Sequence, residues 1–89
     1  MKMNMYTIYD QKLEAYNQPH FMENDAMALR QFADMANDEK ISISKHPEDY
    51  SLWKIATWTS TDTKLKVHDK KLLASAHEHV IQSRELKAI

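Results

Sequence analysis

Residues 46–58 read His-Pro-Glu-Asp-Tyr-Ser-Leu-Trp-Lys-Ile-Ala-Thr-Trp, a proline turn followed by one long hydrophobic run. Pro47 fixes its own φ and biases His46 toward extended geometry, while Glu48 and Asp49 keep the turn solvated. The aromatic and β-branched residues that follow predict a strand over 50–59. Alternation gives it two faces, one with Trp53, Ile55 and Thr57 and the other with Tyr50, Leu52, Ala56 and Trp58. Both faces are largely apolar, which is typical of a central strand or of one covered by a partner.

The residues before this run predict a strand, a hairpin partner and a helix. Residues 3–10 are rich in aromatic and β-branched side chains, and 18–22 is an extended segment that we expect to pair with them. A helix is predicted over 25–36, capped by Asn24 or Asp25 and ended by Asn37 in the left-handed conformation. At 100° per residue, its apolar face holds Ala26, Leu29, Phe32, Ala33 and Ala36, with Ala28 and Met35 at the margin.

The residues around and after the run complete an α+β fold. The alternation over 41–44 indicates a short extended piece, 60–63 a turn, and Leu65 and Val67 a return strand. Asp69 is expected to cap a second helix over about 70–86, with an apolar arc of Leu72, Leu73, Ala76, Val80 and Ile81. We therefore expect a small antiparallel or mixed sheet of three to four strands, with an amphipathic helix on one face plus a C-terminal helix. Residues 1–68 form the core domain, and 69–89 form a C-terminal helix in the same domain or at an oligomer contact.

Composition excludes several classes of protein and site. A chain of 89 residues without cysteine allows one domain and no disulfide or cysteine-based zinc site. The absence of glycine excludes phosphate-binding loops that need it for close backbone approach. No apolar run approaches the roughly 20 residues that span a bilayer, and no signal peptide is visible. We expect a soluble, intracellular protein with no membrane contact.

Charge is divided between the two halves of the chain. The net charge of −1 comes from −4 over residues 1–50 and +3 over residues 51–89. A basic C-terminal half is suited to an anionic partner, although +3 over 39 residues is also an ordinary solvated surface.

Three blocks in order resemble the small nonstructural protein of gokushoviruses, tailless single-stranded DNA phages of the microvirus family. They are Tyr-Thr-Ile-Tyr-Asp at 6–10, Asn-Asp-Ala-Met-Ala-Leu-Arg-Gln-Phe at 24–32, and the run at 46–58. The resemblance covers roughly residues 5–65. It implies a role in a phage's DNA cycle, because the family is labelled DNA-binding by analogy with a protein that favours synthesis and packaging of single-stranded genomes. The family usually has glycine near the end of the third block and in the next turn, where this chain has Ala56 and Ser60-Thr61-Asp62-Thr63. The segment from Asp69 onward has no counterpart in the resemblance.

Aromatic residues in strands next to lysines form the candidate nucleic-acid site. Aromatic rings stack bases and lysines neutralise phosphates in sequence-tolerant single-strand binders. The candidate binding residues are Lys54, Trp58, Lys64, Lys66, Lys70, Lys71 and Arg84. Lys54 and Trp58 are expected on one strand face, and Lys64, Lys66, Lys70 and Lys71 beside a helix amino terminus. The alternatives are that the aromatics are core residues, which is the commoner fate, and that the lysines line a solvated edge.

The sequence contains no motif typical of a metal site, a cofactor site or an enzyme active site. His77-Glu78-His79 places two histidines two residues apart, where a helix points them away from each other, so we predict no metal site. No serine, histidine or carboxylate lies in a recognisable nucleophile or acid–base setting, so we predict no enzyme and no cofactor.

Two functional hypotheses follow. The first is a phage nonstructural protein that binds single-stranded DNA non-specifically in the host cytoplasm during viral genome synthesis or packaging. The second is an oligomeric adaptor that engages a phage or host replication or capsid protein without touching DNA. The apolar arcs of both predicted helices exceed what one small sheet covers, so we expect a homodimer with the tail helix as its first candidate contact, or else that helix packed on the same sheet.

Overall fold

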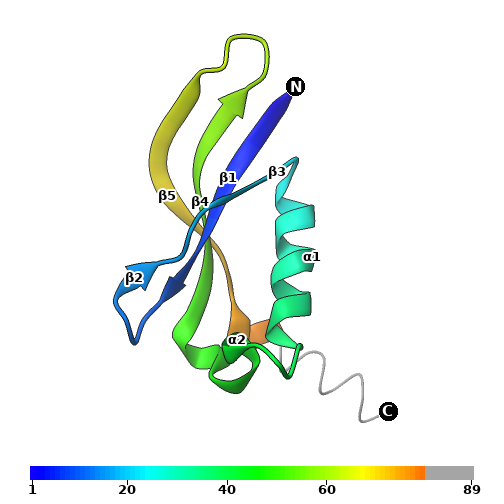
Figure 1. Ribbon diagram of the computed structural model, residues 1–89, viewed down its shortest axis with the longest axis vertical. Coiled ribbons are helices and arrows are strands. Elements are labelled where there is room, and N and C mark those ends of the chain that lie inside the picture. The colour runs from blue at the N-terminus through cyan, green and yellow to red at the C-terminus, as the bar shows by residue number, and fades with distance from the viewer. Residues whose placement is uncertain (80–89) are drawn as a thin grey trace.

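The computed structural model describes residues 1–79, which form a sheet with a helix packed on one face (Figure 1). The strands are β1 (Lys2–Asp10), β2 (Ala15–Tyr16), β3 (His20–Met22), β4 (Tyr50–Thr59) and β5 (Leu65–Ser75). The helices are α1 (Asp25–Ala36), the single turn α2 (Ser42–Lys45) and the 3₁₀ turn η1 (Pro47–Asp49). The α+β class is confirmed, with five strands rather than three or four.

All strand pairs are antiparallel, and β1 and β4 form the centre of the sheet. The order is β2-β1-β4-β5, and β3 pairs with the same strand β1 as β2 does. The hairpin expected between 18–22 and the first strand is therefore confirmed. The predicted central strand over 50–59 is also confirmed, because β4 pairs with β1 on one side and β5 on the other.

A β-bulge in β4 changes which side chains share a face. Tyr6 lies opposite Lys54 and Met5 lies opposite Ala56, so Ile55 is an extra residue in β4. An extra residue shifts the alternation by one position, so side chains beyond it move to the other face. The predicted faces of the run are therefore wrong: Lys54 and Leu52 face α1, whereas Ala56 and Trp58 point away from it.

Helix α1 begins and ends where the sequence predicts. The Asn24 side chain accepts a hydrogen bond from the Met27 backbone N–H at 2.9 Å, which confirms it as the N-cap. Asn37 is not left-handed (φ −106°), so that expectation is wrong. Its side-chain amide instead donates to the Ala33 carbonyl at 2.8 Å and satisfies a helix-end acceptor.

The core lies between α1 and the face of the sheet that α1 covers. Tyr6 and Phe32 are its largest fully buried side chains, and Leu52 packs with them. The buried face of α1 is centred on Ala28, Phe32 and Ala36, spaced four residues apart. The predicted face was rotated, since Ala26 is exposed and Ala28 is buried. Helical periodicity predicts how wide the apolar face of α1 is, but packing against the sheet determines which residues lie at the centre of that face.

Two secondary-structure predictions are wrong. The alternating residues 41–44 do not form a strand, because the structure has the helical turn α2 from Ser42. The backbone N–H groups of Ser44 and His46 bond locally to Ile41 and Ser42 at 3.1 Å, and Ile43 is buried. A single turn thus satisfies its own backbone while directing Ile43 into the core.

The expected start of the C-terminal helix is the larger error. Residues 65–75 are one strand, which pairs with β4 across the point where Asp69 was expected to cap a helix. Helical geometry begins at Ala76 and continues to His79. The helix preference of residues 70–73 is overridden because β4 offers backbone partners both before and after Asp69. Val80 and Ile81, with the rest of the predicted helix, lie outside the described residues.

Candidate nucleic-acid interface

The face of the sheet opposite α1, here called the open face, carries five aromatic side chains. Cross-strand register assigns them, since directly opposed residues share a face: Met3 opposes Trp58, Met5 opposes Phe21, and Thr7 opposes Trp53. Tyr9 and its partner Tyr16 lie on the same face. Figure 1 shows α1 on one side of the sheet only, so in the described part of the chain no helix covers these rings.

The first group on this face, the Trp53 cluster, consists of Tyr9, Tyr16, Trp53 and Lys70. The rings of Tyr9 and Tyr16 have centroids 4.7 Å apart. The Lys70 ammonium lies 5.0 Å from the centroids of both Tyr16 and Trp53, and it donates a hydrogen bond to the Tyr16 hydroxyl. A cation over two ring faces is stabilised by their quadrupoles. The cluster therefore combines flat aromatic surface with one positive charge.

The second group, the Trp58 cluster, consists of Phe21 and Trp58. Their ring centroids are 6.3 Å apart at an interplanar angle of 60°, an edge-to-face contact. Phe21 comes from β3 and is 46% exposed. Trp58 is half-buried near the end of β4. Aromatic surface thus continues along β4 toward the β4–β5 hairpin, which extends past the start of α1 (Figure 1).

Lys54 lies on the face of the sheet that α1 covers, not on the open face. Its ammonium lies 3.1 Å from Asp25 Oδ2 at the start of α1, and the Tyr6 hydroxyl donates to Asp25 Oδ1 at 2.6 Å. The Tyr6 hydrogen bond is the main reason that the pKa of Asp25 is lowered, and Lys54 adds to it. Burial, followed by the bond to Asp25, raises the pKa of Tyr6 from 10.0 to about 12. Lys54 is therefore engaged in joining helix to sheet.

The remaining predicted site residues are divided between surfaces. Lys70 lies on the open face. Lys66 opposes Thr57 and Lys71 opposes Lys54, so both extend on the α1 side of the sheet. Lys64 lies in the hairpin turn between β4 and β5, and all four of these lysines are exposed. Arg84 lies outside the described residues. The structure thus brings Trp58 and Lys70 to one face and separates them from Lys54, Lys66 and Lys71.

Two residues of this surface were missed by the sequence analysis. Tyr16 and Phe21 lie in an irregular segment that contributes only the short strands β2 and β3. The signal was their aromatic character next to a proline-containing extended stretch. Their place beside Trp53 and Trp58 depends on pairing with β1, which local sequence does not specify.

Charge is separated between the sheet and the helices. The five strands together carry five lysines and two aspartates, a net charge of +3. The helices α1, α2 and η1 carry four acids against Arg30 and Lys45. One of the two strand aspartates, Asp10, is buried and accepts hydrogen bonds from the turn that follows β1. The sheet is therefore the basic layer of the molecule.

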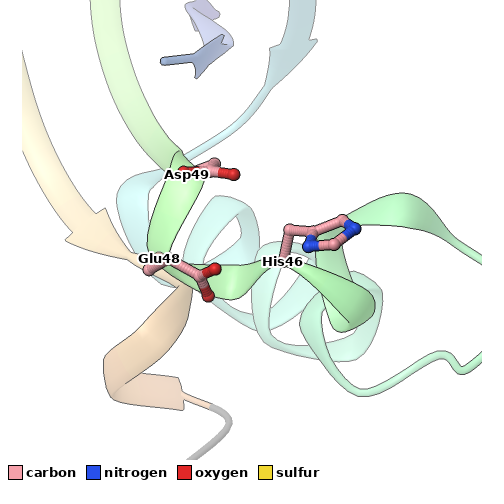
Figure 2. Close-up of side chains that lie close together, drawn as sticks. All are labelled: His46, Glu48 and Asp49. Carbon is pink, nitrogen blue, oxygen red and sulfur yellow. The ribbon is translucent and has the colours of Figure 1, made fainter. Parts of the chain in front are cut away.

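One group of possible metal ligands lies away from the open face. Ligand atoms of His46, Glu48 and Asp49, around η1, lie within 4.8 Å of one another (Figure 2). His46 and Glu48 are exposed, which is typical of a solvated turn. At the other candidate motif, the His79 ring makes an edge contact with Phe32, with centroids 6.0 Å apart. His79 thus packs against the core.

Within residues 1–79, no helix has the length and apolar character needed to cross a membrane. No curated protein matches the chain, and no solved structure matches it either. The model of one family, described as phage ORF5 protein, matches residues 3–79. That match extends from β1 to the helical turn after β5 and so takes in the whole sheet and both aromatic clusters. The chain therefore belongs to the phage ORF5 protein family.

Proposed function

We propose that this phage protein binds single-stranded DNA non-specifically through the open face, in the host cytoplasm, during viral genome synthesis or packaging. The observation that carries the proposal is the Lys70 ammonium placed 5.0 Å from the rings of Tyr16 and Trp53 on an uncovered sheet face. Aromatic faces stack any base and lysines neutralise phosphate, so this combination favours single strands with little sequence preference.

The charge distribution supports the same ligand. The strands carry a net charge of +3, which attracts a polyanion to the sheet. Lys70 places one of these positive charges on the open face, and the other lysines of β4 and β5 extend on the α1 side. Lys64, in the turn between β4 and β5, adds a positive charge beyond Trp58. Binding through a few lysines should weaken with salt, because each neutralised phosphate releases condensed counterions.

The test is fluorescence anisotropy of a labelled single-stranded oligonucleotide at low and moderate salt. We expect binding that weakens steeply as salt rises and that falls when Lys70 is changed to glutamate. Lys40 is also an exposed lysine but lies in the loop after α1, so Lys40→Glu is the matched control and should have a smaller effect. No binding at micromolar protein and low salt would exclude this function.

A protein partner is the second candidate, because three large apolar side chains are exposed on β5. Val67 is 74% exposed, Leu72 53% and Leu65 46%. Such a strip is typical of a protein contact, which would suit a homodimer or an adaptor for a phage or host protein. Sedimentation equilibrium of the wild type and of Val67→Lys distinguishes the cases. An apolar contact should persist at high salt and be lost in the variant, whereas DNA binding should show the opposite salt response.

A further inference from the structure

We propose that the open face holds single-stranded DNA at two stacking sites, the Trp53 cluster and the Trp58 cluster, so that tight binding requires a strand long enough to reach both. This inference rests on the proposed function. It adds the footprint of the ligand, and it assigns binding roles to Tyr16 and Phe21.

Each cluster pairs a half-buried tryptophan with a more exposed ring from the β2–β3 segment. Tyr16 is 41% exposed beside Trp53, and Phe21 stands at an angle to Trp58. The tryptophans are anchored in the central strand β4, so both sites have a rigid base. The exposed ring of each pair supplies the accessible surface on which a base can stack.

The surface between the two clusters is apolar. Ala56 follows Trp53 by three positions and is buried on the open face, and its partner on β5, Val67, is 74% exposed on the same face. Thr7, directly opposite Trp53, is also buried and donates a hydrogen bond to the Asn17 carbonyl at 2.6 Å. The cross-strand partners of Ala56 on this face, Met5 and Val67, are uncharged, so a strand that runs from one cluster to the other along β4 meets apolar side chains.

The separation of the clusters sets the minimum length of ligand. Trp53 and Trp58 lie opposite Thr7 and Met3 of β1, which are four residues apart, or about 13 Å at a rise of ~3.3 Å per residue. A stacked strand that advances ~3.4 Å per nucleotide needs about five nucleotides to cover that distance. A dinucleotide can occupy one cluster but cannot connect the two. Occupation of both sites by one strand should raise affinity without any new contact, through the high effective concentration of the second site.

Lys70 has a specific place in this arrangement. In the free protein its ammonium covers the Tyr16 and Trp53 rings, where a base would stack. Lys70 is exposed, so the side chain is free to swing from the rings to a phosphate. Lys70→Met should therefore lower the salt dependence of binding by about one phosphate contact while leaving stacking on both clusters intact.

The two tryptophans of the chain give one reporter for each site. Trp58→Phe leaves Trp53 as the sole tryptophan, and Trp53→Phe leaves Trp58. We would titrate both variants with oligothymidines of two, five and ten nucleotides at low salt and follow tryptophan quenching. We expect weak quenching by the dinucleotide, quenching of both reporters by the decamer, and a steep rise in affinity between these lengths. Tyr16→Ala and Phe21→Ala should each lower decamer affinity roughly tenfold, within the usual range for loss of one stacking ring.

The control is Met27→Ala, which removes an exposed apolar side chain from α1, on the other side of the molecule. It should leave decamer affinity unchanged, and circular dichroism establishes that each variant is folded. Two results would overturn the two-site inference and leave the proposed function standing. One is decamer binding, measured by fluorescence anisotropy, that quenches only one of the two reporters. The other is an unchanged decamer affinity in Tyr16→Ala or Phe21→Ala. Absence of any binding would overturn both. The inference would also be overturned if the protein sediments as a dimer, both tryptophans are shielded from solvent, and DNA does not change their fluorescence. That result would assign the open face to a second copy of the chain.

Discussion

Replacing Tyr6 with phenylalanine removes one hydroxyl from the point where α1 joins the sheet. That hydroxyl donates to Asp25 at 2.6 Å and accepts from the Asn4 side-chain amide at 3.0 Å. Tyr6 is 1% exposed, whereas the Asp25 side chain is 37% exposed, so Asp25 can recover hydration after the change. A hydrogen bond to a charged group contributes about 1.5–3 kcal/mol, and partial rehydration lowers the expected loss to about 1–2 kcal/mol at pH 7.

The same change should alter how stability depends on pH. The pKa of Tyr6 is raised from 10.0 to about 12 in the folded protein, so folding favours the neutral hydroxyl. Its contribution is fully present below pH 10 and is lost as pH rises through about 12. A shift of two units corresponds to about 3 kcal/mol over that interval. Tyr6→Phe lacks this group, so its stability should fall less between pH 9 and 11.5.

The assay is urea unfolding followed by tryptophan fluorescence at pH 7 and at steps from 9 to 11.5. Tyr9→Phe is the matched control, because it removes a tyrosine hydroxyl from the open face of the same strand. We expect the control to keep the alkaline decline of the wild type. Equal stability of Tyr6→Phe and wild type at pH 7, together with parallel pH profiles, would refute the idea that the Tyr6–Asp25 bond joins helix to sheet.

Three further changes test other parts of the fold, each by urea unfolding. The pKa of Asp25 is lowered in the folded protein, so the carboxylate stabilises the fold above its ordinary pKa of 3.8, and this stabilisation is lost as pH falls through the folded value. Asp25→Asn should therefore reduce the loss of stability at acid pH. An acid decline equal to that of the wild type would contradict this. Asn24→Ala removes the N-cap acceptor and should cost about 1 kcal/mol, with Asn24→Ser as the restoring control. Thr63→Gly should stabilise the β4–β5 hairpin by about 0.5–1 kcal/mol, because Thr63 has φ 60° and glycine adopts that conformation without strain; a loss of stability would show that the Thr63 hydroxyl matters more than its backbone.

The sequence was most informative where structure is local. Asn24 supplies a side-chain acceptor, and the residues after it repeat at helical spacing, so α1 could be bounded from the chain alone. The Pro47 turn and the strand after it were equally clear. Each of these depends on interactions between residues a few positions apart.

Sequence reasoning failed where a neighbouring strand decides the outcome. The lysines and leucines of 70–73 favour a helix in isolation, yet pairing with β4 holds them in a strand to Ser75. The register shifts at Ile55 in the pairing of β4 with both β1 and β5, and this bulge places Trp58 on the opposite face from Lys54. The structure places Trp58 and Lys70 on one face, whereas the sequence analysis had expected Trp58 beside Lys54 and did not include Tyr16 or Phe21.

The sequence by itself determined the α+β class, the bounds of α1 and β4, and the separation of acidic and basic residues, because composition, capping and hydrophobic periodicity are properties of short segments. Only the tertiary structure decided which side chains share the open face. A sheet face is assembled from residues far apart in the chain, and a single inserted residue in one strand reverses every assignment beyond it.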